Sequence, residues 1–242
     1  MRDLEMELPW FIKRLENHSL PSFVRYGDGE FMCMWEHVYG QKARATNCDG
    51  HDYTLPLALD LLHVLRAHNG KMLYGKQRTA FLAKLIGQSP AYTSDLVDVM
   101  APEISWFHGD IFHHASIQGE LAPFLRVFLA QRPVLVGPQI FEDLDKRISS
   151  KVGWLIPIPS KNCYTAKNQI KEAIYKRYRA GHRLFSVSAS MAAKPIIHEL
   201  APVMPDACLL DLGSLWDVFC GKPSRTYHKK MTKETYERNL TL

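Results

Sequence analysis

The chain has 242 residues, 46% of them hydrophobic and 23% charged, with a formal net charge of +5 at pH 7. This length and composition are typical of a globular protein whose core needs no disulfide or zinc site. The five cysteines are scattered without a CxxC pair, and no run of about 18 apolar residues is present. Charged residues interrupt the first apolar residues, unlike a signal peptide. We therefore expect one cytoplasmic domain, residues 1–242, with no membrane span.

Strand and helix signals alternate along the chain. Apolar residues recur at helical spacing in residues 3–17, and a short predicted strand, Ser22–Tyr26, runs directly into Gly27. The later predicted strands are Lys71–Tyr74, Ile104–Phe107, Pro133–Val136, Trp154–Ile158, Leu184–Val187 and Ala207–Leu210. The later predicted helices are Glu30–Val38, Pro56–Ala67, Thr79–Ile86, Glu120–Ala130, Asn168–Arg179 and Met191–Leu200, with a helical turn at Leu215–Phe219.

This alternation determines the expected fold class. Strands separated by helices indicate parallel βαβ units, and uninterrupted apolar strands such as VLV, LFSV and CLL indicate burial on both faces. We therefore predict an α/β, Rossmann-like fold with a mostly parallel sheet covered by helices on both faces. Ligands bind such sheets at the carboxyl ends of the strands, which is where the polar residues of interest lie in this sequence.

The most informative stretch is Arg25-Tyr-Gly27-Asp28-Gly29-Glu30, at the end of the first predicted strand. Its glycines allow a tight turn, and we expect both carboxylates on the surface of a cleft. Two convergent carboxylates suit a hard divalent cation, Mn²⁺ or Mg²⁺, held together with substrate phosphates. Arg25 would add a bidentate phosphate contact. From spacing alone, an ordinary Asp-Gly turn before an acidic helix start stays open.

A family resemblance strengthens the functional interpretation of this stretch. The segment SFVRYGDGEF resembles the signature of GT-D-type glycosyltransferases, in which a strand enters an Arg-x-Gly-Asp-Gly-Glu turn. The resemblance implies that Asp28 and Glu30 bind the metal and the nucleotide-sugar, within a site that includes Arg25, Gly27 and Gly29. Weaker similarities cover 154–164, 184–200 and 211–228, whereas 40–130 match no part of the family pattern.

The sequence His108-Gly-Asp110-Ile-Phe-His113-His114 forms a second polar cluster, after a predicted strand. Asp110 at the strand end is a candidate general base that would deprotonate an acceptor hydroxyl, with His113 as the alternative. Neighbouring His and Asp side chains also suit a transition metal. A polar loop with a surface histidine pair is an equally open interpretation.

Three further sets of residues are candidates for nucleotide-sugar binding. Ser188 and Ser190 precede a helix whose free N–H groups would hold a phosphate, although Ser190 is also a typical N-cap. They stand where the family pattern has a Gly-Pro-like turn. Asp211 would bind a ribose hydroxyl or simply end its strand. Arg225 and His228 would close over the pyrophosphate, unless residues 222–233 are a solvated basic tail.

These observations favour a metal-dependent glycosyltransferase that moves a sugar, expected from a UDP-sugar, to a hydroxyl acceptor on a glycan or glycoprotein. The alternative acceptor is DNA with hydroxymethylated bases, as in phage-type genomes, contacted by the basic segments 167–179 and 222–233. A non-catalytic nucleic-acid binder would not need convergent carboxylates. A Rossmann methyltransferase would carry a glycine-rich turn after its first strand, and this chain has none.

Overall fold

The computed structural model describes residues 8–40, 47, 50–68, 70, 72–76, 101, 103–225 and 228–242. Its centre is a seven-stranded sheet with the order β3-β2-β1-β7-β6-β4-β5. All strand pairs within the described residues are parallel. The strands are β1 (Ser22–Tyr26), β2 (Met72–Lys76), β3 (Trp106–His108), β4 (Val134–Pro138), β5 (Trp154–Ile158), β6 (Leu184–Val187) and β7 (Cys208–Leu210). The predicted α/β class and parallel sheet are confirmed.

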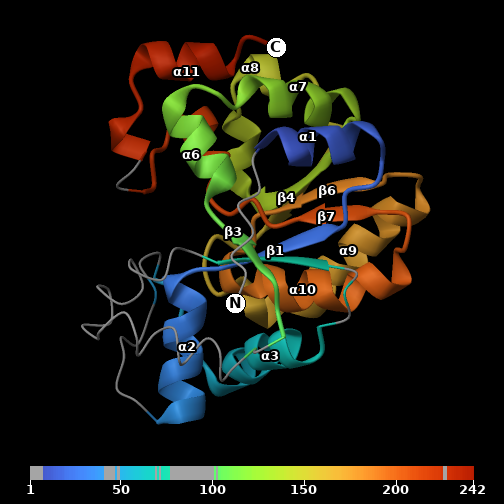
Figure 1. Ribbon diagram of the computed structural model, residues 1–242, viewed down its shortest axis with the longest axis vertical. Coiled ribbons are helices and arrows are strands. Elements are labelled where there is room, and N and C mark those ends of the chain that lie inside the picture. Colours follow the sequence, from blue (N-terminus) through green and yellow to red (C-terminus); the bar gives the residue numbers. More distant parts are fainter. Residues whose placement is uncertain are drawn as a thin grey trace.

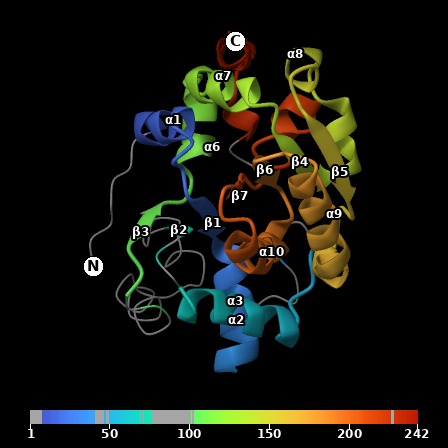
Figure 2. The same ribbon diagram turned by 90° about the vertical axis from the view of Figure 1, so that its right-hand side faces the viewer.

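Helices cover both faces of the sheet (Figures 1 and 2). One face carries α2 (Asp28–Tyr39), α3 (Leu55–Arg66), α9 (Lys167–Arg179) and α10 (Ala193–Leu200). The other carries α1 (Leu8–Glu16), α6 (Ile111–Gln118), α7 (Ala122–Ala130), α8 (Lys146–Ser149) and α11 (Lys233–Asn239). Short 3-10 turns join these elements at Gln139–Asp143, Cys163–Ala166, Ser190–Ala192, Ala201–Val203, Asp217–Cys220 and His228–Lys230.

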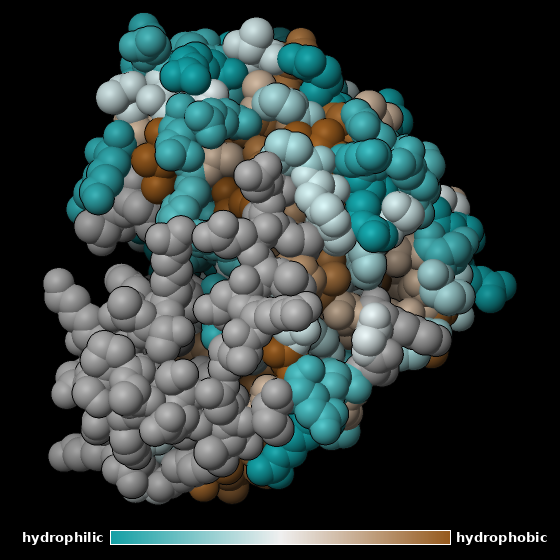
Figure 3. All heavy atoms as spheres, in the orientation of Figure 1, coloured by the Kyte–Doolittle hydropathy of each residue, from teal (hydrophilic) through white to brown (hydrophobic). Residues whose placement is uncertain are grey.

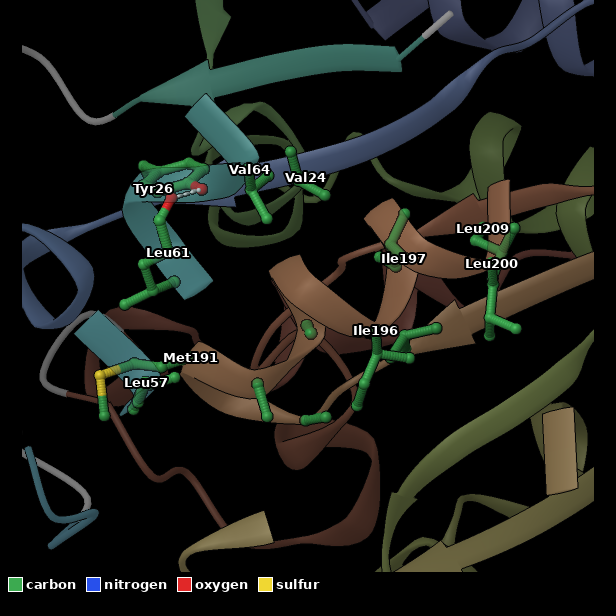
Figure 4. Close-up of a cluster of buried hydrophobic side chains, with 14 of the residues drawn as sticks. Val24, Tyr26, Leu57, Leu61, Val64, Met191, Ile196, Ile197, Leu200 and Leu209 are labelled. Atoms are coloured by element: carbon green, nitrogen blue, oxygen red, sulfur yellow. Dashed lines mark hydrogen bonds between the residues drawn. The ribbon is translucent and has the colours of Figure 1, made fainter. Parts of the chain in front are cut away.

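The core below β1 shows how the sequence pattern builds this arrangement. Helix α3 begins after the N-cap Thr54, whose side chain accepts from the Leu57 N–H, and its apolar face packs toward β1 and α10. The Tyr26 hydroxyl donates to the Leu61 carbonyl at 2.9 Å, which joins β1 to α3 across this core (Figure 4). The hydrogen bond satisfies a buried polar group. Strand β1 is therefore held firmly just before the turn that carries Asp28.

Three described helices were not predicted from the sequence: α6, α11 and the four-residue α8. Helix α6 (IFHHASIQ) includes buried residues next to a histidine pair, so its apolar periodicity is weak. Helix α11 (KETYERN) is mostly polar and begins at Thr232, whose side chain accepts from the Thr235 N–H. Helices α6 and α11 depend on tertiary contacts more than on their own periodicity. The predicted helix at 79–86 lies outside the described residues.

The C-terminal segment is docked against the helical layer of α6 and α7. Asn239 is fully buried, and its amide donates to the Ser116 carbonyl at 2.7 Å and accepts from the Leu121 N–H at 3.0 Å. Leu240 is also buried. These contacts anchor the end of the chain to the core. Within 222–233, by contrast, the side chains of Lys222, Lys229, Lys230 and Lys233 are exposed, as in a solvated basic tail, whereas His228 is buried.

In the view of Figure 3, hydrophilic side chains cover much of the upper helical layer, with apolar side chains visible between them. Among the described residues, no helix is both long enough and apolar enough to cross a membrane.

Candidate functional site

A buried ionic cluster joins the carboxyl ends of β1 and β7 to helix α10. The ammonium of Lys194 lies 2.5 Å from Glu30 Oε1 and 2.9 Å from Asp211 Oδ2. All three residues are buried, at 4%, 6% and 1% exposed respectively. The other Glu30 oxygen, Oε2, accepts from the Gly27 N–H at 2.8 Å. Glu30 is therefore an internal, paired carboxylate, and the expectation that it lies on a cleft surface is wrong.

The charges of this cluster stabilise one another. Burial is the largest single influence and would raise the pKa of Glu30, but the charge of Lys194, its hydrogen bond and the backbone hydrogen bonds together lower the pKa below its ordinary value. Burial alone would lower the pKa of Lys194, but Asp211 and Glu30 raise it. Both groups are thus charged at neutral pH, and removal of one partner would leave an uncompensated buried charge.

Asp28 has a different environment from Glu30, although it lies two residues away. It is the first residue of α2, and burial followed by the charge of Glu30 raises its pKa. The charge of Arg225 lowers it in part. Asp28 is therefore a carboxylate that a nearby cation would stabilise.

Arg25 connects β1 to the start of α6. Its Nη1 lies 2.8 Å from His113 Nδ1, and its Nη2 lies 3.6 Å from Asp110 Oδ1. The Arg25 N–H donates to Asp211 Oδ2 at 3.3 Å. Gly213 has φ +54°, and a Cβ there would lie 3.1 Å from Arg25 Nη1. The turn after β7 thus brings its backbone directly against the guanidinium.

Asp110 and His113, the two candidate general bases, differ in their surroundings, and His113 resembles a third side chain, His228. His113 is 3% exposed, and burial together with the charge of Arg25 holds its pKa well below the ordinary value. Burial and the charge of Arg225 likewise lower the pKa of His228 to about 4, and its Nδ1 accepts from the Arg225 N–H at 3.2 Å. Both imidazoles are therefore neutral at pH 7. The Asp110 carboxylate is more accessible, at 24% exposed.

The turn after β6 lies next to the ionic cluster. The Ser190 carbonyl accepts from Lys194 Nζ at 3.3 Å, and its hydroxyl accepts from the Asn47 side chain at 3.3 Å. Ser190 has φ +50° and opens a 3-10 turn before α10, so it is not the N-cap of that helix. The Ser188 Oγ is buried and has no hydrogen-bond partner within the described part of the chain. A backbone strained at Ser190 and an unsatisfied hydroxyl at Ser188 are both typical of ligand sites.

The structure brings the predicted site residues to one end of the sheet. Contacts link Arg25, Glu30, Asp110, His113 and Asp211, and electrostatic interactions connect Asp28, Arg225 and His228 to them. Sequence reasoning missed Lys194, which lies in an otherwise apolar helix start (AAKPII). A charged residue at a position expected to be buried was the available signal. It also missed Lys76, a buried lysine at the carboxyl end of β2 whose Nζ lies 5.7 Å from the Trp106 ring centroid.

Solved structures share this fold. A structure described as a new glycosyltransferase (DUF1792) from Streptococcus sanguinis aligns with a TM-score of 0.65 at 16% identity, covering 98% of this chain and 93% of that one. A second, described as the highly conserved domain of unknown function 1792 with a distinct glycosyltransferase fold, has a TM-score of 0.65 at 16% identity and coverages of 99% and 91%. No family model and no curated protein matches the sequence. At this identity, the similarity shows a shared fold.

The site fits a divalent cation in part. Among the described residues, no group of three or more His, Cys, Asp or Glu side chains is arranged to hold a metal ion. Asp28 suits direct contact with a cation because its pKa is raised by burial and by Glu30. Both Glu30 oxygens already have partners, so direct ligation by Glu30 would compete with Lys194 and with the Gly27 N–H.

Proposed function

We propose that this protein is a glycosyltransferase that moves a sugar from a nucleotide-sugar, first of all a UDP-sugar, to a hydroxyl acceptor. The observation that carries the proposal is the grouping of Asp28, Arg25 and Arg225 at the carboxyl end of β1. This grouping occurs in a fold shared with structures described as glycosyltransferases. The end of a parallel strand is where such folds bind ligands.

The two arginines would bind the donor diphosphate. Arg25 Nε is buried and has no hydrogen-bond partner within the described residues, although the rest of its guanidinium contacts His113 and Asp110. Arg225 lies close enough for its charge to lower the pKa of Asp28. Guanidinium groups bind phosphate oxygens through paired, charge-assisted hydrogen bonds. Together they would place the diphosphate next to Asp28.

Asp28 is the proposed direct contact to a divalent metal, Mn²⁺ or Mg²⁺, with phosphate oxygens as further ligands. Such a metal, when bound, neutralises the charge that develops on the leaving nucleoside diphosphate. Glu30 contributes negative charge to the site while Lys194 holds its side chain in place. Ser188 and the backbone at Gly27 and Gly29 would complete the phosphate contacts.

Asp110 is the proposed general base for the acceptor hydroxyl. It lies at the end of β3, and its carboxylate is partly accessible beside Arg25. His113 is less suited because it is buried and Arg25 faces its Nδ1. An imidazole that accepts from an arginine and has a lowered pKa is a poor proton acceptor at pH 7.

The acceptor we favour is a glycan or glycoprotein hydroxyl. Helices α9 and α11, which contain or adjoin the basic segments, lie on opposite faces of the sheet (Figure 1). Within α9, Lys167 pairs with Asp60 and Glu199, and Lys171 also contacts Glu199. A duplex would need these charges exposed on one face. The position of α9 and α11 on opposite faces and the pairing of the α9 lysines with carboxylates therefore do not favour DNA as the acceptor.

The test is a donor panel of UDP-, GDP-, ADP- and CDP-sugars with glycan, peptide and hydroxymethylated-DNA acceptors, with Mn²⁺ or with EDTA. We expect transfer, measured by mass gain, with a nucleotide-sugar and Mn²⁺, and its loss in Asp28→Asn. Glu120→Gln, a change of an exposed carboxylate, is the matched control and should keep full activity. Turnover that is unchanged by EDTA and by Asp28→Asn would overturn the metal assignment. Transfer to DNA alone would replace the favoured acceptor.

A further inference from the structure

A cavity of about 610 Å³ lies beyond the carboxyl ends of β5 and β6. It is lined by the segment before and at the start of α3, by the turn after β5, and by the turn after β6. Its lining residues include His51, Asp52, Leu57, Asn162, Thr165 and Met191. This volume is within the range of small-molecule sites, which are usually formed before the ligand arrives.

Three hydrogen bonds hold the mouth of this cavity in shape. The Asn162 N–H donates to His51 Nδ1 at 3.0 Å, and the Asp52 N–H donates to Asn162 Oδ1 at 2.8 Å. The Asn162 amide also donates to Asp52 Oδ2 at 2.6 Å. Asn162 has φ +50°, an uncommon conformation for a residue other than glycine. These hydrogen bonds join the two segments directly.

The lining suits a neutral polar ligand better than a phosphate. Lys167 is the only lysine or arginine among the described lining residues, and its ammonium lies 2.6 Å from Asp60 and 2.8 Å from Glu199. Asp52 contributes a carboxylate, which would repel phosphate and would accept hydrogen bonds from hydroxyl groups. Leu57 and Met191 add apolar surface for a flat ring.

The cavity adjoins the ionic cluster through shared residues. Met191 lines the cavity, and its Cγ lies 3.7 Å from the position that a Cβ on Gly29 would take. Asn47 lies 3.4 Å from that same position, and its Oδ1 accepts from the N–H of His51. One short segment therefore contacts the Asp28–Glu30 turn and continues into the cavity wall.

Strand order decides which part of a donor the cavity would take. From β1, strand β3 with Asp110 lies on one side, and β6, β4 and β5 lie on the other. Strand spacing places β6 roughly 10 Å from β1 and β5 roughly 19 Å from it. The transferred sugar must lie near the general base Asp110 and near the acceptor, which places it on the β3 side of β1. A diphosphate at β1 would then direct the nucleoside toward β6 and β5.

We propose that this cavity binds the nucleoside of the donor, its base and ribose, with Asp52 and Asn162 facing the hydroxyl-bearing part. The inference rests on the proposed transfer from a nucleotide-sugar. It assigns the nucleotide specificity of the enzyme to the segments 51–57 and 162–168. These segments lie apart from the residues that handle the diphosphate and the acceptor.

The test uses Thr165→Trp, which places a bulky ring at an exposed position of the cavity lining and removes the hydrogen bond from the Thr165 hydroxyl to the Asn162 carbonyl. Thr241→Trp, another exposed threonine, is the matched control. Calorimetric titration, all with Mn²⁺, measures the affinity for UDP, GDP, ADP and CDP and the affinity for inorganic pyrophosphate. The nucleoside diphosphates report on the cavity and the diphosphate contacts together, and pyrophosphate reports on the diphosphate contacts alone. We expect Thr165→Trp to weaken the best nucleoside diphosphate by about tenfold or more and to leave pyrophosphate unchanged.

The outcomes separate this inference from the proposed function. If Thr165→Trp binds the nucleoside diphosphate as the wild type does, the nucleoside lies elsewhere and the cavity proposal is overturned. If pyrophosphate weakens equally, the substitution has disturbed the whole site, and photo-crosslinking of wild-type protein with 4-thiouridine diphosphate decides. Label on 162–168 supports the proposal, and label on another segment overturns it. If the wild type binds no nucleoside diphosphate, the donor class itself is wrong.

Discussion

The carboxyl edge of the sheet contains two regions that are held together in different ways. At the ends of β1 and β7, Glu30, Lys194 and Asp211 are buried charges that depend on one another. Beyond β5 and β6, Asp52 and Asn162 hold a cavity open with hydrogen bonds near the surface. The first region is sensitive to the loss of any single charge, whereas the second is sensitive to shape. Substitutions that remove a charge should therefore have their largest effects in the first region.

The largest effect is expected from Asp110→Asn, on the β3 side of the charged region. Loss of a positioned general base should lower kcat by about 100- to 10,000-fold and leave nucleoside diphosphate affinity nearly unchanged. Steady-state kinetics with calorimetric binding checks this, with Glu120→Gln as control. A change in affinity alone would make Asp110 a binding residue and leave the base to be found elsewhere.

Next in size is the effect of Lys194→Met on stability. Removal of the ammonium leaves Glu30 and Asp211 buried as like charges, which should lower the free energy of unfolding by about 3–5 kcal/mol. Lys171→Met removes a lysine near the surface and should cost about 0–1 kcal/mol. Urea unfolding compares the two variants. Equal losses would contradict the view that the Lys194 cluster holds this edge together.

Glu30→Gln should lower the free energy of unfolding by about 1.5–3 kcal/mol, because it removes charge-assisted hydrogen bonds to Lys194 and to the Gly27 N–H. The lowered pKa of Glu30 means that this contribution is present at neutral pH and is lost as the pH falls through the folded-state pKa. Unfolding measured from pH 7 to pH 3 should therefore show the wild type and the variant converging at acidic pH. A difference that stays constant with pH would contradict the ion pair.

Asp28→Asn should have the smallest effect on stability, and of the opposite sign. Because burial and Glu30 raise the pKa of Asp28, the folded state binds a proton more readily than the unfolded state does. Ionised Asp28 therefore lowers stability above its folded pKa, and the neutral amide should slightly raise the melting temperature at pH 7. Thermal unfolding of Asp28→Asn and Glu30→Gln, measured under the same conditions, compares their melting temperatures with that of the wild type. A fall as large as that of Glu30→Gln would show that the two carboxylates have the same environment.

The sequence predicted the strands well because their apolar runs are buried by both helical layers. It also predicted that the candidate site residues follow the strands, and the structure has RYGDGE at the end of β1 and the other candidates after later strands. It did not predict the burial of Glu30, because that depends on Lys194, which lies 164 residues further along the chain in α10. Nor did it predict the cavity, whose walls come from segments more than 100 residues apart. Long-range contacts of this kind leave no local periodicity.

The most direct test of the proposed donor site is the effect of Mn²⁺ on nucleoside diphosphate binding in the wild type and in Asp28→Asn. Titration calorimetry with UDP, and with the other nucleoside diphosphates if UDP is weak, gives the affinity with Mn²⁺ and with EDTA. If Asp28 contacts a metal shared with the diphosphate, Mn²⁺ should tighten wild-type binding by about tenfold or more and should have no effect on Asp28→Asn. An equal effect of Mn²⁺ on both proteins, or none on the wild type, would contradict the assignment of Asp28.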